Sequence, residues 1–389
     1  MKKLIKIIIF LAMILPIQVN ASGRLVDDIL DRNPLRSGAD FTVTANNSNI
    51  SSQEGLFSSE DDYGTTYFFR GTHALNNNVV FAGHQWKILR IEGNRSIRLI
   101  YNGVCPDNEC NINGNTAGAA ATIGNSLFNT PNNQNRFVGY MFGSLTGTFE
   151  QQHANTYNSV IKDMVDTWFD NLPQEEKLLT VNTQFCIDRS ISSGTGLGNT
   201  STDYGPMARV ELGRTPILQC PREEDILNSR VGLISIDEAA MAGGVWATAN
   251  GDSFLRTNQI FWTISPRRFT DNIASTNHIG NDGSLGRTDV SSARGVRPVI
   301  SLNADVSFTG IGSAEDPYII TGLYEEEIVE PNNPEEPDGN EENEDNSIIN
   351  PETNDINLMF IVITTVIAIL GLIYTLIKMR KINQMEILR

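Results

Sequence analysis

The sequence predicts an α+β domain followed by one C-terminal transmembrane helix. Two strand-like segments flank a short turn at residues 92–95, and segments with helical signals follow at 160–172 and 235–243. Near the end of the chain, residues 358–377 form an uncharged apolar run of twenty residues. A helix of that length rises about 30 Å, which matches the hydrocarbon thickness of a bilayer.

The first 21 residues have the pattern of a secretory signal peptide. Three lysines within the first six residues precede the apolar stretch from Ile7 to Ile17, and Val19-Asn20-Ala21 supplies small residues for cleavage. We therefore expect cleavage after Ala21 and export of the chain. The alternative is an uncleaved membrane anchor, but the apolar stretch is short for a membrane span.

Between the signal peptide and residue 322 lie about three hundred residues, enough for one large domain or for one domain with an extension. Residues 22–61 are polar and contain one short helical candidate, Leu25 to Leu30. We interpret them as an N-terminal extension. The folded extracellular domain is then predicted to begin near Asp62 and to cover residues 62–322.

The first clear element of that domain is a β-hairpin. Residues 85–91 and 96–101 are rich in apolar side chains and flank the turn sequence Glu92-Gly93-Asn94-Arg95, in which Gly and Asn are available for positive φ. A preceding strand is predicted at residues 79–81.

The middle of the domain contains a loop region and a helix. Residues 111–148 are rich in Gly, Asn and Thr, which favours loops with one short strand at 137–142. From Val160 to Leu172, apolar residues recur at helical spacing, and Pro173 ends the helix. This stripe includes Trp168 and Phe169, which we assign to the core rather than to a ligand platform.

A second, short helix is predicted by a capping box. Ser235 and Glu238 stand at S-x-x-E spacing, and Gly243-Gly244 supplies a C-terminal stop. Glu238 and its neighbour Asp237 form an adjacent acidic pair, but capping explains Glu238 without catalysis.

Two late strands are expected at residues 259–264 and 296–302. Pro298 has no N–H to donate, so the second strand is predicted to be an edge strand or to carry a bulge. Residues 266–294 between them are polar and are predicted as one long loop. Such a loop serves either as a binding site or merely as a solvated connection.

The four cysteines, Cys105, Cys110, Cys186 and Cys220, fall in the part predicted to be exported. An even number outside the cell permits two disulfides with three connectivities, of which we favour the pairing of nearest neighbours, Cys105–Cys110 and Cys186–Cys220. Zinc is the competing interpretation, but no histidine stands at ligand spacing from a cysteine or another histidine. No metal and no other cofactor are therefore expected.

The formal net charge of −17 is concentrated near the C-terminus. Residues 324–355 carry thirteen acidic side chains and no basic ones. With almost no apolar content, residues 323–355 are predicted to be a disordered, self-repelling stalk. The chain has no basic stripe to neutralise phosphates, which argues against a nucleic-acid partner.

Several motifs together resemble an uncharacterised domain found in surface proteins of Gram-positive-type bacteria. The resemblance covers roughly Tyr63 to Ile320 and implies a surface protein, but that family brings no established activity. The motifs are YFFRG, NNNVVFAGHQWKILRIEGNRSIRLIYNG, RFVGYMFG, NSVIKDMVDTWFDNL, FCIDRS, GLISIDEAAMAGG, FWTISP, GVRPVISL and GIGSAEDPYII.

The order of elements is also similar, more distantly, to C-type-lectin-like folds, including the formylglycine-generating enzymes. This likeness implies a loop-rich α+β domain with a twisted, mixed or antiparallel sheet and two helices. The sequence departs from both functional types. The region of FWTISP and GVRPVISL has no cysteine for a copper-binding pair, and a WND-type calcium motif is absent. Fold likeness alone carries no function.

Known catalytic signatures are absent from the sequence. There is no G-x-S-x-G, no P-loop and no H-E-x-x-H, so no catalytic residue is assigned. His84, beside the hairpin, is interpreted as packed or solvated rather than catalytic.

The residues before the apolar run resemble a sorting signal for class B sortases. Asn350-Pro351-Glu352-Thr353-Asn354 matches an NPxTN pattern, followed by the span at 356–377 and a basic tail at 378–389. The resemblance implies recognition through Asn350 and Pro351, acylation of the sortase at Thr353, and release of a fragment that begins at Asn354. The alternative is a type I membrane protein with a chance match in a biased linker.

These features predict a binding or adhesion module displayed on the cell surface. Its partners would be the membrane, a sortase and peptidoglycan, together with a glycan or protein ligand, and its N-terminal domain would be extracellular because the basic tail stays in the cytoplasm. The alternative is an extracellular enzyme that acts on wall or environmental material. A sensor is a weaker third idea, because the cytoplasmic tail is too short for a signalling domain.

Overall fold

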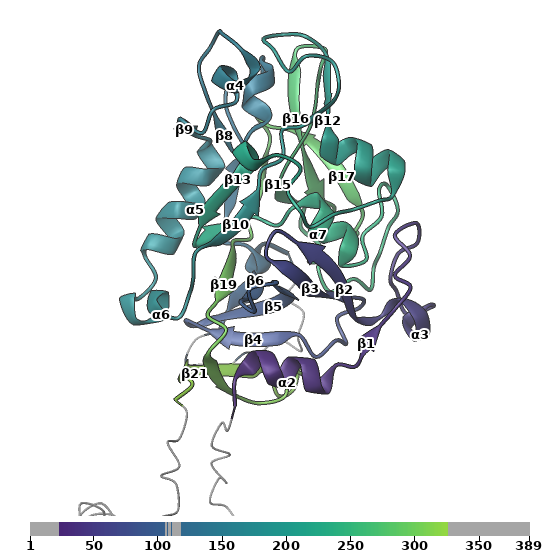
Figure 1. The fold of residues 1–389 in the computed structure, drawn as a ribbon, viewed down its shortest axis with the longest axis vertical. Helices are drawn as coiled ribbons and strands as arrows, with labels where there is room; N and C mark the ends of the chain where they lie inside the picture. The colour runs from purple at the N-terminus through teal and green to yellow at the C-terminus, as the bar shows by residue number, and fades with distance from the viewer. Residues whose placement is uncertain (1–22, 106, 108–109, 111–117, 326–389) are drawn as a thin grey trace, which may run out of the picture. The chain divides into compact units, whose positions relative to one another are not determined.

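The computed structural model describes residues 23–105, 107, 110 and 118–325, and its fold is mixed α+β, rich in sheet and poor in helix (Figure 1). The predicted fold class is thus confirmed at the level of α+β. The predicted signal peptide, most of the stalk, the NPETN motif, the apolar span and the basic tail lie outside the described residues.

The larger sheet has ten strands among the described residues. Its central hairpin, β5 and β6, is the predicted one, and the N-terminal and C-terminal strands of the described chain both join this sheet. In spatial order the strands are β1 (Leu35–Arg36), β2 (Gly55–Asp61), β3 (Gly64–Arg70), β5 (His84–Ile91), β4 (Asn78–Phe81), β21 (Tyr318–Leu323) and β20 (Val306–Thr309), with β6 (Ile97–Val104), β19 (Val299–Leu302) and β14 (Val231–Gly232) continuing from β5.

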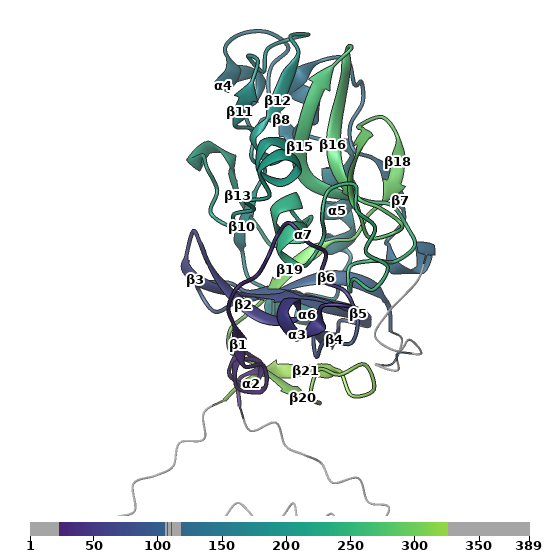
Figure 2. The same cartoon turned by 90° about the vertical axis from the view of Figure 1, so that its right-hand side faces the viewer.

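A second sheet lies above the first in the view of Figure 1. It is built around the long hairpin of β15 and β16, and two small two-stranded ladders lie beside it (Figure 2). Its strands are β11 (Ile191–Ser193), β12 (Thr202–Tyr204), β15 (Phe261–Thr270), β16 (Ile273–Ile279), β17 (Leu285–Asp289), β18 (Ala293–Gly295) and β7 (Asn125–Leu127), and the ladders are β10 (Thr183–Cys186) with β13 (Ile226–Ser229) and β8 (Met141–Phe142) with β9 (Tyr157–Asn158).

The helices are short, and three of them, α2, α5 and α7, are predicted from the sequence. In α5, Ser159 accepts a hydrogen bond from the N–H of Lys162, and the stripe that contains Val165 and Phe169 faces the core. In α7, Ser235 and Glu238 form the predicted capping box. The helices are α2 (Leu25–Arg32), α3 (Ile50–Gln53), α4 (Phe149–Gln152), α5 (Val160–Asp170), α6 (Gln174–Leu178) and α7 (Ile236–Met241), with 3₁₀ turns at Gly118–Ala121, Asn135–Val138 and Glu223–Asp225 and a π-helical segment at Met207–Gly213.

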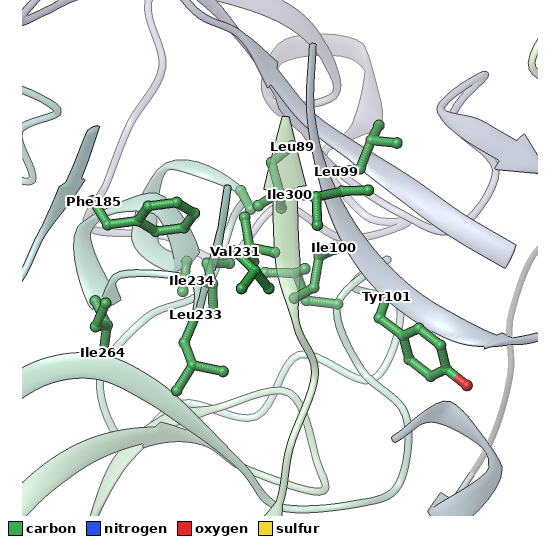
Figure 3. Packing of buried hydrophobic residues seen from close by; sticks show 14 of the residues in the cluster. Leu89, Leu99, Ile100, Tyr101, Phe185, Val231, Leu233, Ile234, Ile264 and Ile300 are labelled. Carbon is green, nitrogen blue, oxygen red and sulfur yellow. The ribbon is translucent and has the colours of Figure 1, made fainter. Parts of the chain in front are cut away.

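The core is centred on β19, which lies between β14 and β6. Ile300 is paired with Val231 on one side and with Leu99 on the other, and all three side chains are buried (Figure 3). Pro298 therefore does not mark an edge strand. It immediately precedes β19, so its missing N–H costs no hydrogen bond within that strand.

The predicted boundary at residue 62 is wrong. Residue 62 lies in the turn between β2 and β3, which pair along their full length from Gly55–Arg70 to Asp61–Gly64. Upstream, α2 is confirmed as a helix, and its Leu25, Val26 and Ile29 are fully buried. The folded unit therefore includes nearly all of the segment interpreted as an extension, because these apolar residues complete the core.

The predicted loop at 266–294 is also wrong, because it contains most of the second sheet. β15 continues through Pro266, where the pairing with β16 shifts register and so tolerates the missing N–H. Asp271 and Asn272 both have positive φ, as a two-residue hairpin turn requires. The polar composition concealed these strands, since many of their polar side chains are buried in hydrogen bonds. Of the strand predicted at 137–142, only β8 (Met141–Phe142) is a strand, and residues 137–138 are the end of a 3₁₀ turn.

The two ends of the described chain lie together. Arg24 forms an ion pair with Asp305 at 2.6 Å and stacks on Tyr324, and β21 pairs with β4. Both views show the described chain beginning and ending at one end of the folded unit, whereas α4 and β8 lie at the opposite end (Figures 1 and 2). Among the described residues, no helix combines the length and apolar character needed to span a membrane.

One buried cation in this sheet has no carboxylate partner. Lys87 on β5 is fully buried, and its Nζ donates a hydrogen bond to Oδ1 of Asn78 at 2.5 Å. Burial, and then the charge of Arg297, lower the pKa of Lys87 to about 7. An unfolded lysine titrates near pH 10 (about 10.4), so between about pH 7 and pH 10 the unfolded chain binds more protons than the folded one.

We therefore predict that stability rises with pH across that window because of Lys87. Lys87→Met should remove this contribution, so the difference in unfolding free energy between the parent and the variant should shift by about 1.4 kcal/mol per pH unit in favour of the parent as pH rises. Urea denaturation of the parent and the variant between about pH 7 and pH 10 measures this difference in unfolding free energy. Lys177→Met, at a half-exposed position, is the control, and parallel pH curves for parent and Lys87→Met would contradict the assignment.

Candidate functional site

A small pocket lined by charged side chains lies between the β2–β3 turn, β6 and α7. We call it the charged pocket. Its volume of about 30 Å³ leaves room for roughly two water molecules. Its lining comprises the acids Asp61, Asp62, Asp188, Asp237 and Glu238, the arginines Arg90, Arg98 and Arg209, and ten other residues from Tyr63 to Ser265.

Glu238 is the centre of the first ionic cluster in this pocket. Its Oε1 lies 3.1 Å from Nε of Arg90 and 2.7 Å from Nε of Arg98, while its Oε2 accepts the N–H of Ser235. Burial alone would raise the pKa of Glu238, but the two guanidiniums and the N–H of Ser235 outweigh it and lower the pKa. Glu238 is therefore held as a carboxylate.

Two further acids neutralise these arginines. Arg90 donates to Asp61 at 2.5 Å and to Glu92 at 3.1 Å, and Arg98 reaches Glu92 at 3.2 Å. Burial would lower the pKa of Arg90, but the surrounding carboxylates raise it above its ordinary value. The cluster thus contains three carboxylates and two guanidiniums, all nearly excluded from solvent.

Asp237 belongs to a second cluster on the other side of α7. It receives two hydrogen bonds from Arg209, at 3.1 and 2.9 Å, and a third from the N–H of Ile217. Arg209 also lies 2.7 Å from Asp188. Burial raises the pKa of Asp237 despite these partners, because its desolvation outweighs the attraction of Arg209.

Both clusters consist of buried carboxylates paired with arginines. The four buried carboxylates of the lining, Asp61, Asp188, Asp237 and Glu238, each pair with a guanidinium. Among the described residues, no group of three His, Cys, Asp or Glu side chains could hold a metal ion. The acidic pair noted in the sequence therefore fixes α7 to its surroundings.

The other sequence-predicted residues do not converge on this pocket, apart from Cys186. The disulfides are Cys105–Cys110 and Cys186–Cys220, which is the pairing favoured from the sequence. His84 packs against Tyr101 at 5.3 Å and Trp168 at 5.6 Å, and burial lowers its pKa. The sorting-signal residues lie outside the described residues.

A second, open hollow lies over the β8–β9 ladder and the start of α5. We call it the distal groove, because β8 lies far from the two ends of the described chain (Figure 2). Its volume is about 840 Å³. It is lined by Arg136, Phe142, Ser144, Leu145, Thr156, Tyr157, Asn158 and Asp163.

Aromatic side chains form one wall of the distal groove. Tyr157 on β9 lies against Phe142 on β8, with ring centres 5.8 Å apart and planes tilted by 38°. The guanidinium of Arg136 lies 5.4 Å from the centre of the Phe142 ring. Tyr157 is 54% exposed and is the one exposed aromatic residue in the described part of the chain. The ring of Tyr157 is thus held in place by Phe142 and leaves apolar surface open to solvent in the groove.

Hydrogen-bond donors and acceptors are both held in place at the rim of this groove. Nη1 of Arg136 donates to the carbonyl of Gly143 at 2.8 Å, which orients the guanidinium. Nδ2 of Asn158 donates to Oδ1 of Asp163 at 2.8 Å, leaving the other oxygen of Asp163 and the amide oxygen of Asn158 as acceptors. Burial lowers the pKa of Arg136 from its high ordinary value. One positive and one negative group leave the rim without net charge.

Sequence reasoning missed the distal groove. Phe142 and Tyr157 are separated by a Gly- and Thr-rich segment and meet only because β8 pairs with β9 over two residues. The one available signal was an aromatic residue between polar residues, Thr156-Tyr157-Asn158, which matches no defined motif.

No protein-family model, no curated protein and no solved structure matches this chain. The resemblance to bacterial surface domains therefore stays a prediction.

The ion pairs of the charged pocket predict that removing the charge of Glu238 strongly lowers the stability of the fold. Glu238→Gln keeps the size of the side chain but leaves Arg90 and Arg98 short of a buried counter-charge. We expect the free energy of unfolding to fall by about 3–5 kcal/mol in urea denaturation. Glu175→Gln, at an exposed position on α6, should change it by less than about 0.5 kcal/mol. Equal effects of the two substitutions would refute the structural role.

Proposed function

We propose that this chain is a binding module displayed on the cell surface and that the distal groove is its ligand site, with a saccharide chain as the ligand. The observation that carries the proposal is the exposed ring of Tyr157, held against Phe142 in an open groove with polar groups at its rim.

The chemistry of the groove fits a saccharide. Sugar rings present apolar C–H faces that stack on exposed aromatic rings, and hydroxyl groups that both donate and accept hydrogen bonds. The groove offers Tyr157 and Phe142 for the faces, Asp163 and Asn158 as acceptors, and Arg136 as a donor. A few fixed polar groups beside apolar surface are typical of ligand sites. The neutral rim gives no advantage to a strongly charged ligand.

The position of the groove supports display. The described chain ends at Glu325, at the end of the folded unit opposite β8, and the predicted stalk and span follow that residue. A ligand site at the opposite end from the attachment would be open to the surroundings. Residues 356–377 would anchor the chain, with the basic tail at 378–389 in the cytoplasm.

The finer fold type is also part of the proposal. We assign the domain to the C-type-lectin-like type, on the order of its elements: early strands up to β6, then α5 and α7, then the β15–β18 sheet, then Arg297-Pro298 before β19. The long β15–β16 hairpin lies largely within the region predicted as a loop, residues 266–294. The proposed ligand site uses aromatic, amide, carboxylate and guanidinium groups of the chain itself.

Removing the aromatic platform should weaken ligand binding. We predict that Tyr157→Ala raises the Kd for a saccharide selected on a glycan array by roughly tenfold or more, because a central aromatic contact contributes about 1–2 kcal/mol or more. Isothermal titration calorimetry with the mature protein measures it.

Leu178→Ala is the matched control for this substitution. Leu178 is a large apolar side chain, 63% exposed, that lies on α6 outside the groove. Its loss should leave the Kd unchanged. Binding to a parallel protein array but to no glycan would contradict the saccharide assignment, and equal losses from both variants would contradict the placement of the site.

For attachment, we propose sortase cleavage between Thr353 and Asn354. Mass spectrometry of the protein released from the wall should show a C-terminus at Thr353, joined to a peptidoglycan amine. Thr353→Ala should abolish this species and leave the uncut chain in the membrane fraction. An intact Arg389 on the wall-exposed protein would contradict sorting and leave anchoring by the membrane span.

A further inference from the structure

A short irregular segment, residues 216–220, lies across the charged pocket. We call it the strap. Ile217, Leu218 and Gln219 of the strap line the pocket, with the acids and arginines of the two ionic clusters beneath them. The strap belongs to no helix or strand. It is joined to β2 by a bridge between Asp61 and Leu218, and the Leu218 side chain also packs against the cluster of Phe57, Phe68 and Met241. Its position over the pocket therefore depends on a few identifiable contacts.

Two of these contacts are hydrogen bonds from the strap backbone to carboxylates. The N–H of Ile217 donates to Asp237 at 3.1 Å. The N–H of Cys220 donates to both oxygens of Asp62 at 3.1 Å. Asp62 lies at the exposed mouth of the pocket, so water competes for this contact, and such bonds contribute only about 1 kcal/mol each.

The strongest attachment is covalent. The disulfide Cys186–Cys220 joins the end of the strap to the end of β10, 34 residues earlier in the sequence. Both cysteines are half-buried, so the disulfide lies near the surface of the domain. Cys186 itself lines the charged pocket. The disulfide therefore holds one end of the strap beside the charged pocket.

The strap also separates the charged pocket from two larger hollows. A hollow of about 340 Å³ lies between the strap and Ser58 to Glu60 of β2. Another of about 500 Å³, with Phe41, Phe57 and Phe68 in its wall, reaches Pro216 at the start of the strap. Displacing residues 216–220 would join these spaces to the charged pocket along the edge of β2.

We propose that the Cys186–Cys220 disulfide is a redox latch: reduction frees the strap and opens the charged pocket into one cleft with the hollows along β2. The reductant is a dithiol. One thiolate attacks a sulfur of the disulfide, forming a mixed disulfide and releasing one cysteine as a thiol after it gains a proton. The second thiol of the reductant then displaces the other cysteine, so the protein gains two electrons and two protons and the dithiol becomes a disulfide.

The core does not depend on this bond for its arrangement. The ionic clusters hold α7, β5 and β6 together independently of the disulfide, and β10 is paired with β13 over four residues. Reduction should therefore release the strap locally rather than unfold the domain. The closed state has the strap over the pocket, and the open state keeps the same sheets.

Hydrogen exchange on the full chain, with and without dithiothreitol, tests the latch. We expect amide exchange of residues 217–220 to speed up by roughly tenfold or more on reduction, while β5 and β6 keep their protection. The double variant Cys186→Ser/Cys220→Ser should show the fast exchange without reductant. Re-oxidation of the parent should restore the slow exchange.

The second disulfide provides the matched control. Cys105→Ser/Cys110→Ser should leave the exchange of residues 217–220 slow in the oxidised protein, and this variant should still respond to dithiothreitol. Unchanged exchange in the strap after reduction overturns the latch, because the remaining contacts then suffice to hold it. Loss of protection throughout β5 and β6 also overturns it, because the disulfide then holds the whole fold.

Discussion

The fold depends on the carboxylate of Glu238, which two buried arginines share. Arg90 comes from β5 and Arg98 from β6, whereas Glu238 belongs to a helix far along the chain. A buried charge without a partner costs several kcal/mol, so α7 can dock only where its acid meets both guanidiniums. This requirement fixes the helix against the first sheet, and Asp61 extends the same network to the β2–β3 turn.

The same helix links the core to the surface. Its capping glutamate faces the first sheet, while its neighbour Asp237 faces Arg209 and the backbone of Ile217 in the strap. The rigidity of the core thereby reaches a segment that has no secondary structure of its own. The covalent link from Cys220 to Cys186 adds the second fixed point, so a short irregular segment covers the charged pocket.

The distal groove has the opposite physical character. Its aromatic and polar side chains stay exposed to water, its rim is neutral, and its shape comes from a two-residue ladder rather than from a buried network. A surface of that kind is suited to a ligand that is itself hydrated and weakly charged. The ionic clusters and the proposed ligand site thus lie in different parts of the domain.

The sequence by itself determined the elements whose signals are local. The β5–β6 hairpin, the helix ended by Pro173 and the capping box at Ser235 each depend on residues a few positions apart, and they agree with the structure. Only the tertiary structure decided where the domain begins, that residues 266–294 form strands, and that Tyr157 meets Phe142. These features arise from pairing between distant segments and from buried polar side chains satisfied by partners elsewhere in the chain, and neither leaves a periodic pattern in the local sequence.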